Sequence, residues 1–457
     1  MINNQFSLKP FAALLPILLA SCATFSPDGG FSNVEKITQN YIKQKPLWAN
    51  TDKQKQAATE QVKVLLSQSL TVDDAVQLAL LNNAQVQADV YALQIAEADL
   101  VQAGRLPNPS FSMLYTRNNG DYKIEQILTT NIFALLTMPQ AVKIEKKRFA
   151  AMQNVVSLQI LSLAFETRKA YFYAVGAYEN VSYLTKVKSS AEATAEFAKR
   201  MRMAGNFNKL DLAREQTYYS QAALDLAQAE NQQVQANEAL AQLLGVENTT
   251  AFTLPERLPD LPKSSEVLKN VTSDDFAKRL DLQQIKLNTQ ALAAQLGLTK
   301  TTRFINVLEI GPARVLEGRR GDPYKKGIQF SFELPIFDWG NAKLKRAEAS
   351  YMQALNVATN QTILAASEVR SHYNQYRTNY DVAKHYRDEI IPLRKRVLQE
   401  NLLRYNGMLI GPFDLMADAR AQVQSVNSYI EALRDFWIAE SNLEMSLIGK
   451  PINVGEN

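Results

Sequence analysis

Few residues in this sequence could do chemistry. The two histidines, His372 and His385, fall thirteen residues apart in one expected helix, and the single cysteine, Cys22, excludes a disulfide within the chain. No nucleophile motif, phosphate-binding loop or spacing of metal ligands accompanies them. The sequence therefore predicts a protein that is not an enzyme, with no cofactor and no metal site.

Cys22 stands at the end of an expected export signal. Lys9 supplies its positive charge, and residues 11–19 form an apolar run shorter than the roughly 20 residues that span a bilayer as a helix. Leu19-Ala20-Ser21 before Cys22 resembles a bacterial lipobox, in which the cysteine is acylated, for example with palmitate. We expect a lipoprotein signal peptide over residues 1–21 and a lipid-anchored lead-in over 22–69. An ordinary cleaved signal with an incidental cysteine is the alternative.

Two long helical hairpins dominate the rest of the chain. We expect Pro139 to open the first long helix, a turn at Gly205-Asn206, and a return to Gly245. A first arm of roughly 65 residues would be about 100 Å long at about 1.5 Å per residue. Apolar residues recur in it every seven positions, which is typical of a coiled-coil seam: Phe149, Val156, Leu163, Ala170, Ala177, Leu184, Ala191 and Ala198.

The second hairpin is expected over residues 341–449. Its turn is expected near residues 407–412, and Pro392 is expected to kink its first arm. Its seven-residue column contains Leu355, Val369, Tyr376, Ala383, Ile390 and Val397.

Short strands precede each hairpin, within residues 108–136 and 303–337. Phe111, Met113 and Tyr115 alternate with polar or small neighbours, as a strand requires, and residues 328–334 alternate most regularly. The order helix–strand–strand–helix–helix thus occurs twice, so we expect one repeat at 70–251 and another at 271–449. Residues 252–270 would link them, and 450–457 would be a tail. The fold class is mainly α with a small β part.

The mature chain is not expected to span a membrane as a helix. It contains no run of roughly 18 uncharged apolar residues, so strands closed into a barrel are the alternative way across. Four strands cannot close a barrel, because the smallest bacterial barrels have about eight, whereas three chains would supply twelve. The unpaired edges of a four-stranded sheet therefore indicate an oligomer.

At this level the sequence resembles the TolC-like outer-membrane efflux proteins (outer membrane factors), in their lipidated branch. The resemblance covers about residues 70–449. It depends on the duplicated order and on three segments: 70–83 (LTVDDAVQLALLNN), 104–109 (GRLPNP), and 404–407 (RYNG) followed by 413–419 (FDLMADA).

The resemblance implies an architecture, a cellular location and partners. The duplicated hairpins would form a periplasmic helical barrel, and four strands per chain would contribute to a trimeric, twelve-stranded transmembrane β-barrel. The implied protein is a homotrimeric channel in the cell outer membrane, of Gram-negative type, lipid-anchored and spanning the periplasm. It would receive substrates from an inner-membrane efflux pump and a periplasmic adaptor (membrane fusion) protein. Ala23 fits this location, because Asp at that position favours inner-membrane retention in similar lipoproteins.

The resemblance also implies a gate at the periplasmic end. Acidic residues just after the last turn line the mouth in this family, and the candidates here are Asp414 and Asp418, with Arg420 as a candidate partner. Symmetry-related carboxylates at a constriction would repel one another and attract cations. Asp414 could equally cap its helix, and capping is the favoured role of Asp211.

Adaptor docking would use the two turns. The candidates are Gly205, Asn206, Phe207, Gly407, Met408 and Ile410. We expect the apolar members, Phe207, Met408 and Ile410, to be exposed at the tips, where they would suit a partner contact. Methionines near the tips suit either Cu(I), through their thioethers, or adaptable packing. The sequence does not identify the transported substrate.

A soluble periplasmic coiled-coil scaffold or adaptor, without a membrane barrel, is the alternative function. The regular alternation of residues 328–334 and the presence of two hairpins argue against it. The net charge of +4 is small and spread out, so no nucleic-acid partner is expected.

Overall fold

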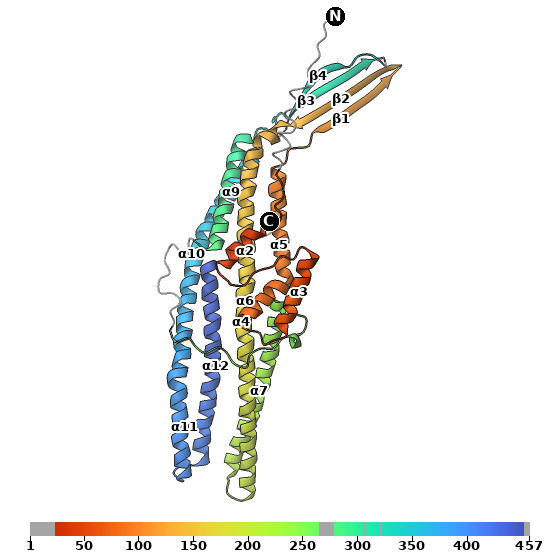
Figure 1. Ribbon diagram of the computed structural model, residues 1–457. Helices are drawn as coiled ribbons and strands as arrows, with labels where there is room; N and C mark the ends of the chain where they lie inside the picture. Colours follow the sequence, from red (N-terminus) through yellow and green to blue (C-terminus); the bar gives the residue numbers. More distant parts are fainter. Residues whose placement is uncertain (1–22, 265–277, 306, 320, 452–457) are drawn as a thin grey trace. The chain divides into compact units, whose positions relative to one another are not determined.

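The computed structural model describes residues 23–264, 278–305, 307–319 and 321–451, and Figure 1 gives the order of its elements. The expected signal peptide and the lipid attachment at Cys22 lie outside this part of the chain. The fold is mostly helical with one small antiparallel sheet, as the sequence predicts. Its main elements are α2 (Phe31–Gln39), α3 (Asp52–Leu66), α4 (Val72–Asn82), α5 (Ala84–Ala103), β1 (Ser110–Asn118), β2 (Asp121–Asn131), α6 (Ile132–Met203), α7 (Lys209–Leu244), α9 (Leu280–Thr302), β3 (Leu308–Gly318), β4 (Lys325–Phe332), α10 (Asn341–His385), α11 (Ile391–Asn406) and α12 (Pro412–Ile448).

The chain forms two compact units, which are described separately. The first contains the described residues within 1–34, 90–156 and 282–362, and it holds the sheet. The second contains the described residues within 35–89, 157–281 and 363–457, and it holds both hairpin turns.

The sheet of the first unit has one apolar face. Its strands lie in the order β1-β2-β3-β4, all antiparallel, so β1 and β4 form its two edges. Directly opposed residues share a face. One face carries Tyr115, Ile124 and Leu316 in one row and Ile310 and Phe330 in another.

The opposite face of the sheet is mostly polar or small, although Leu114, Ile127 and Val315 also lie on it. Thr116, Lys123 and Glu317 form one row on it, and Glu309 lies opposite Ser331. On the apolar face Gln126, Arg314 and Lys326 form a polar row. Arg314 hydrogen-bonds to Gln126 and lies 5.1 Å from the ring centre of Tyr324. The expected strand pattern is confirmed, and β3 and β4 lie within the expected range 303–337.

Helix α6 begins earlier than the sequence predicts. It starts at Ile132, and Asn131 caps it by accepting a hydrogen bond from the Ala134 amide at 2.9 Å. Pro139 therefore lies inside the helix and does not open it. The expectation was wrong because β2 runs directly into α6, so the cap lies at the last strand residue. The helix has 72 residues.

Helices α4 and α5 are separate, whereas the order helix–strand–strand–helix–helix predicts a single helix before the first strand. The break is at Asn83, whose backbone is extended at φ −73° and ψ 121°. The Asn83 side chain turns away from its own helix and donates to the Leu243 carbonyl at 2.9 Å. A tertiary contact thus interrupts a run with good helix propensity.

By length and composition, α6 could cross a membrane. It contains an 18-residue window of mean hydropathy 1.2. The sequence pattern predicts no helix of this kind in the mature chain. Half of that window is buried inside the structure, and the core helix of a soluble protein meets the same criterion.

The core of the second unit is an aromatic cluster closed by the inter-repeat segment. The rings of Phe172 and Trp437 stack at 5.3 Å, and Phe436 packs against Trp437 at 5.1 Å. The described part of the chain between the repeats, residues 252–264, packs onto this core, since the Trp437 indole donates to the Pro259 carbonyl at 3.1 Å and Leu261 is buried. This segment is therefore part of the core and more than a spacer.

The two expected coiled-coil seams differ in how many of their residues are buried within a single chain. In α6, Val156, Ala177, Leu184, Ala191 and Ala198 of the seven-residue column are buried. The column in α10 and α11 is buried only in its middle, at Val369, Tyr376 and Ala383, and it is exposed at Leu355 and Val397.

The expected kink at Pro392 coincides with an irregular helical segment. Residues Tyr386–Ile390 form a π-helical turn just before it. Such turns interrupt the regular hydrogen-bond ladder and commonly mark functional sites.

Candidate gate and docking site at the hairpin tips

The first turn is closed by backbone and side-chain hydrogen bonds. Gly205 has a φ of 82°, a conformation that favours glycine, and the Asn206 amide donates to the Met201 carbonyl at 3.0 Å. Asn208 is the N-cap of α7 and accepts from the Asp211 amide at 2.8 Å. Asp211 accepts from the Asn208 side-chain amide in return, so it supports the cap from the first turn.

Phe207 does not fit its expected role in docking. Its side chain is only 9% exposed, because it packs beneath the turn, and its carbonyl accepts from Arg202 at 3.2 Å. A hydrophobic residue at a turn is thus used for packing. The exposed apolar side chains of this tip are Met203 and Leu210.

The second turn presents more apolar surface. Met408 is 93% exposed and Leu409 is 77% exposed, whereas Ile410 is half-buried. Met408 has a φ of 57°, which costs a non-glycine residue about 1 kcal/mol. The neighbouring Gly407 keeps an ordinary negative φ of −82°. The Leu409 amide closes the turn on the Arg404 carbonyl at 2.8 Å.

The three candidate gating residues have different partners. Asp414 lies in the first turn of α12 and accepts from the Gly411 amide at 3.3 Å, a capping contact. Asp418 accepts from the Asn401 side-chain amide across the hairpin. Arg420 pairs with neither aspartate. It contacts Glu215 of α7, with 2.7 Å between Nη2 and Oε1.

The Arg420–Glu215 pair joins the two return helices. The Glu215 side chain is 1% exposed, and its Oε2 has no hydrogen-bond partner among the described residues. The Arg420 guanidinium lies 4.2 Å from the ring centre of Tyr218, a cation–π distance. Burial raises the pKa of the Tyr218 hydroxyl. Glu215 is buried while the Arg420 side chain is 32% exposed, so loss of Arg420 would leave a buried carboxylate without its charged partner.

Glu215 was missed at the sequence level, although the sequence contains its signal. It lies at seven-residue spacing from buried residues of the same helix, namely Ala222, Ala229 and Ala236. A carboxylate in an otherwise alanine column predicts a buried partner. The described residues contain no group of three His, Cys, Asp or Glu side chains arranged to hold a metal ion.

The two hairpins and the four-stranded sheet form a fold that solved structures of outer-membrane channels share. Solved structures with this fold include CusC, at a TM-score of 0.69 and 17% identity over 85% of this chain and 92% of that one. The outer-membrane channel OprN matches with a TM-score of 0.69 and 17% identity over 86% and 92%. The outer membrane protein VceC from Vibrio cholerae matches with a TM-score of 0.66 and 14% identity over 87% and 97%.

The model of the outer membrane efflux protein family matches residues 75–246 of the chain. The resemblance to the TolC-like outer membrane factors is thereby confirmed, and these proteins are transport channels of the outer membrane, not enzymes. No curated protein sequence matches the chain.

Proposed function

We propose that this chain is the outer-membrane channel of a tripartite efflux system. Three copies would form the channel, which would pass substrates from an inner-membrane pump and a periplasmic adaptor to the exterior. The single observation that carries this proposal is the sheet, with one mostly apolar face, one mostly polar face and two edges without a strand partner in the described chain. An apolar outer face and a polar lumen are what a membrane barrel requires.

The strand lengths and the exposed seam support a trimer. The four strands have 9, 11, 11 and 8 residues, near the roughly 9–11 that cross a bilayer when tilted. Phe111, Ile328 and Phe330 are each more than 60% exposed in one chain. Leu355 and Val397 leave the helical seam open in the same way, so both parts need neighbouring copies.

The trimer is tested by extracting the full chain from membranes with detergent. Native mass spectrometry of the purified protein is expected to give three copies, and planar bilayers are expected to show channels. A monomer in the soluble periplasmic fraction would contradict the proposal and favour the scaffold alternative.

We infer that the gate includes the Glu215–Arg420 pair as well as Asp414 and Asp418. The pair holds α7 to α12 near both turns, so its loss would let the second hairpin move. Glu215→Gln and Arg420→Gln are each expected to raise single-channel conductance. Glu230→Gln, which removes a charge from an exposed site on α7, is the matched control and is expected to leave conductance unchanged.

The role of Asp414 and Asp418 is tested by a different measurement, the cation selectivity of the channel. Asp414→Ala and Asp418→Ala are expected to lower cation selectivity if these carboxylates line the mouth. Selectivity equal to that of the parent protein would assign Asp414 to capping alone.

Adaptor docking is proposed at the exposed tips. Gly205, Asn206 and Gly407 shape the turns, and Met408 and Leu409 offer the apolar contact, with the half-buried Ile410 behind them. Met408→Asp is expected to reduce co-purification of the adaptor while the trimer persists. Val64→Asp, at an exposed position on α3, is the control. Equal loss in both variants would contradict specific docking at the tip.

Acylation of Cys22 is also proposed, on the lipobox that precedes it. Cys22→Ser is expected to abolish incorporation of labelled palmitate. Labelling that persists in the variant would contradict this assignment.

A further inference from the structure

A basic cavity lies in the unit that carries the sheet. It has a volume of about 650 Å³ and is formed by the end of α9 and the start of α10, with Phe133 of α6 at its side. Its lining includes the cationic side chains of Arg303, Lys343 and Arg346 and no acidic residue. Its volume lies in the range of small-molecule sites, about 300–1,000 Å³.

The two arginines are arranged differently. Arg303 is held in place, because its Nη1 donates to Asn341 at 3.1 Å and its guanidinium lies 4.5 Å from the ring centre of Phe304. Arg346 is exposed and forms no ion pair with the described carboxylates. Lys345, one position earlier on the same helix, pairs with Glu348 at 3.5 Å and does not line the cavity. The charge of Arg346 is therefore available inside the cavity.

Apolar residues continue from the cavity toward the sheet. Ile305 lines the cavity and is 44% exposed, and the strand β3 begins at Leu308. Phe304 packs edge-on against Trp339 at 6.4 Å, and Trp339 is 57% exposed. Exposed aromatic rings beside the ends of membrane strands are typical of the membrane–water interface.

We propose that this cavity binds the phosphate group of an anionic phospholipid. Arginine side chains match phosphate oxygens with paired donors, and the hydroxyls of Thr299 and Ser350 add two more donors in the same lining. The acyl chains would lie against Ile305 and the exposed rings. This inference rests on the proposed function, because a lipid is present here only if the sheet lies in a membrane.

The test uses the full chain in phosphatidylcholine vesicles with and without phosphatidylglycerol. After extraction, bound lipid is measured by native mass spectrometry. We expect phosphatidylglycerol to be enriched about fivefold per cationic side chain engaged. Arg346→Gln is expected to lower the enrichment of phosphatidylglycerol about fivefold, and Arg346→Lys is expected to keep most of the enrichment. Lys345→Gln removes the same charge outside the cavity and is expected to change nothing.

Three results would overturn the site. Equal binding of the two lipids, equal loss in Arg346→Gln and Lys345→Gln, or displacement of the lipid by millimolar inorganic phosphate would each do so, the last because it indicates a free-anion site. Failure of the proposed function is distinguishable, since the protein would then enter neither kind of vesicle.

Discussion

The two repeats cap the ends of their return helices with different chemistry. At the end of α7, the Asn82 amide donates to the carbonyls of Leu244 and Gly245 at 3.0 and 2.6 Å, and Asn83 donates to Leu243. At the end of α12, the guanidinium of Arg279, just before α9, donates to the Ser446 carbonyl at 2.5 Å. Both satisfy carbonyls that a helix leaves unpaired, one with neutral amides and one with a charge.

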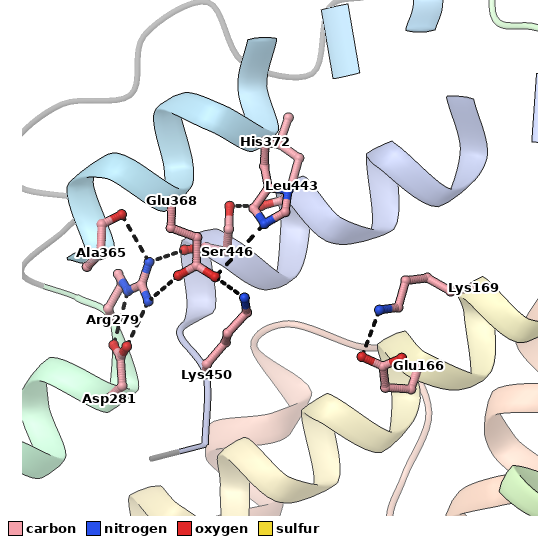
Figure 2. A network of polar contacts seen from close by, with 10 residues as sticks. All are labelled: Glu166, Lys169, Arg279, Asp281, Ala365, Glu368, His372, Leu443, Ser446 and Lys450. Atoms are coloured by element: carbon pink, nitrogen blue, oxygen red, sulfur yellow. Dashed lines mark hydrogen bonds and ion pairs between the residues drawn. The ribbon is translucent and has the colours of Figure 1, made fainter. Parts of the chain in front are cut away.

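The Arg279 cap lies in a network with other charged side chains (Figure 2). Arg279 is completely buried, and it pairs with Asp281 at 2.7 Å and with Glu368 at 3.1 Å. Glu368 also contacts Lys450 and lies 3.9 Å from His372. Burial lowers the pKa of His372, so Arg279 and Lys450 supply the positive charge at neutral pH. A buried charge is tolerated only when it is paired, whereas a buried amide needs only its hydrogen bonds.

Of the variants that compare the two caps, removal of Arg279 is expected to cause the largest loss of stability. Arg279→Leu leaves Asp281 buried beside an apolar side chain, which is expected to destabilise the protein by about 3–5 kcal/mol. The midpoint of thermal unfolding in detergent measures this loss. The variant is also expected to expose the C-terminal end of α12 to limited proteolysis.

A double variant separates the lost pairing from the lost capping bond. Arg279→Leu with Asp281→Leu removes both members of the pair, so it is expected to recover much of the stability lost in Arg279→Leu alone. If the double variant instead lost the sum of the stabilities lost in Arg279→Leu and Asp281→Leu, the ion pair would not explain the difference between the two caps.

A second difference concerns buried carboxylates inside the return helices. When the helix ends Leu244 and Ile448 are aligned, Glu440 of α12 is equivalent to the buried Ala236 of α7. Glu440 is 9% exposed, and burial, with help from Glu444, raises its pKa from 4.5 to about 7. The folded chain therefore holds a proton that the unfolded chain releases near pH 4.5.

This shift makes stability depend on pH. Its contribution is fully present below about pH 4.5 and is lost as the pH rises through about 7, which amounts to roughly 3 kcal/mol at most. Glu440→Gln is expected to raise the unfolding midpoint at pH 8 and to leave it unchanged near pH 4.5. Glu431→Gln, at an exposed position on the same helix, is the control. Equal stabilisation at both pH values would contradict a buried protonated Glu440.

Much of the fold follows from sequence patterns. The seven-residue columns predict the long hairpins, and the glycine-containing turns at residues 205–206 and 407–412 lie where they are expected, because periodicity and turn chemistry are local. The alternation at Ile328, Phe330 and Phe332 predicts β4 for the same reason.

The remaining features depend on contacts between segments far apart in the chain. Asn83 breaks a helix to reach Leu243, and Arg420 pairs with Glu215, which lies 205 positions away. Phe207 was expected at the surface but packs inward, because side-chain direction at a turn is set by the backbone around it. Such contacts have no signature in either segment alone. Only the alanine column around Glu215 offered one.

The smallest effect is expected at the neutral cap. Asn82→Ala removes two hydrogen bonds but leaves no buried charge, so a loss of about 1–2 kcal/mol is expected, well below that of Arg279→Leu. Asn82→Asp keeps the shape of the side chain, yet it directs a carboxylate at the Leu244 and Gly245 carbonyls and at the negative end of α7. It is therefore expected to lower the unfolding midpoint more than Asn82→Ala does. An aspartate variant as stable as the parent would mean that the amide donors do not cap α7, and the contrast between the repeats would then reduce to the ionic network alone.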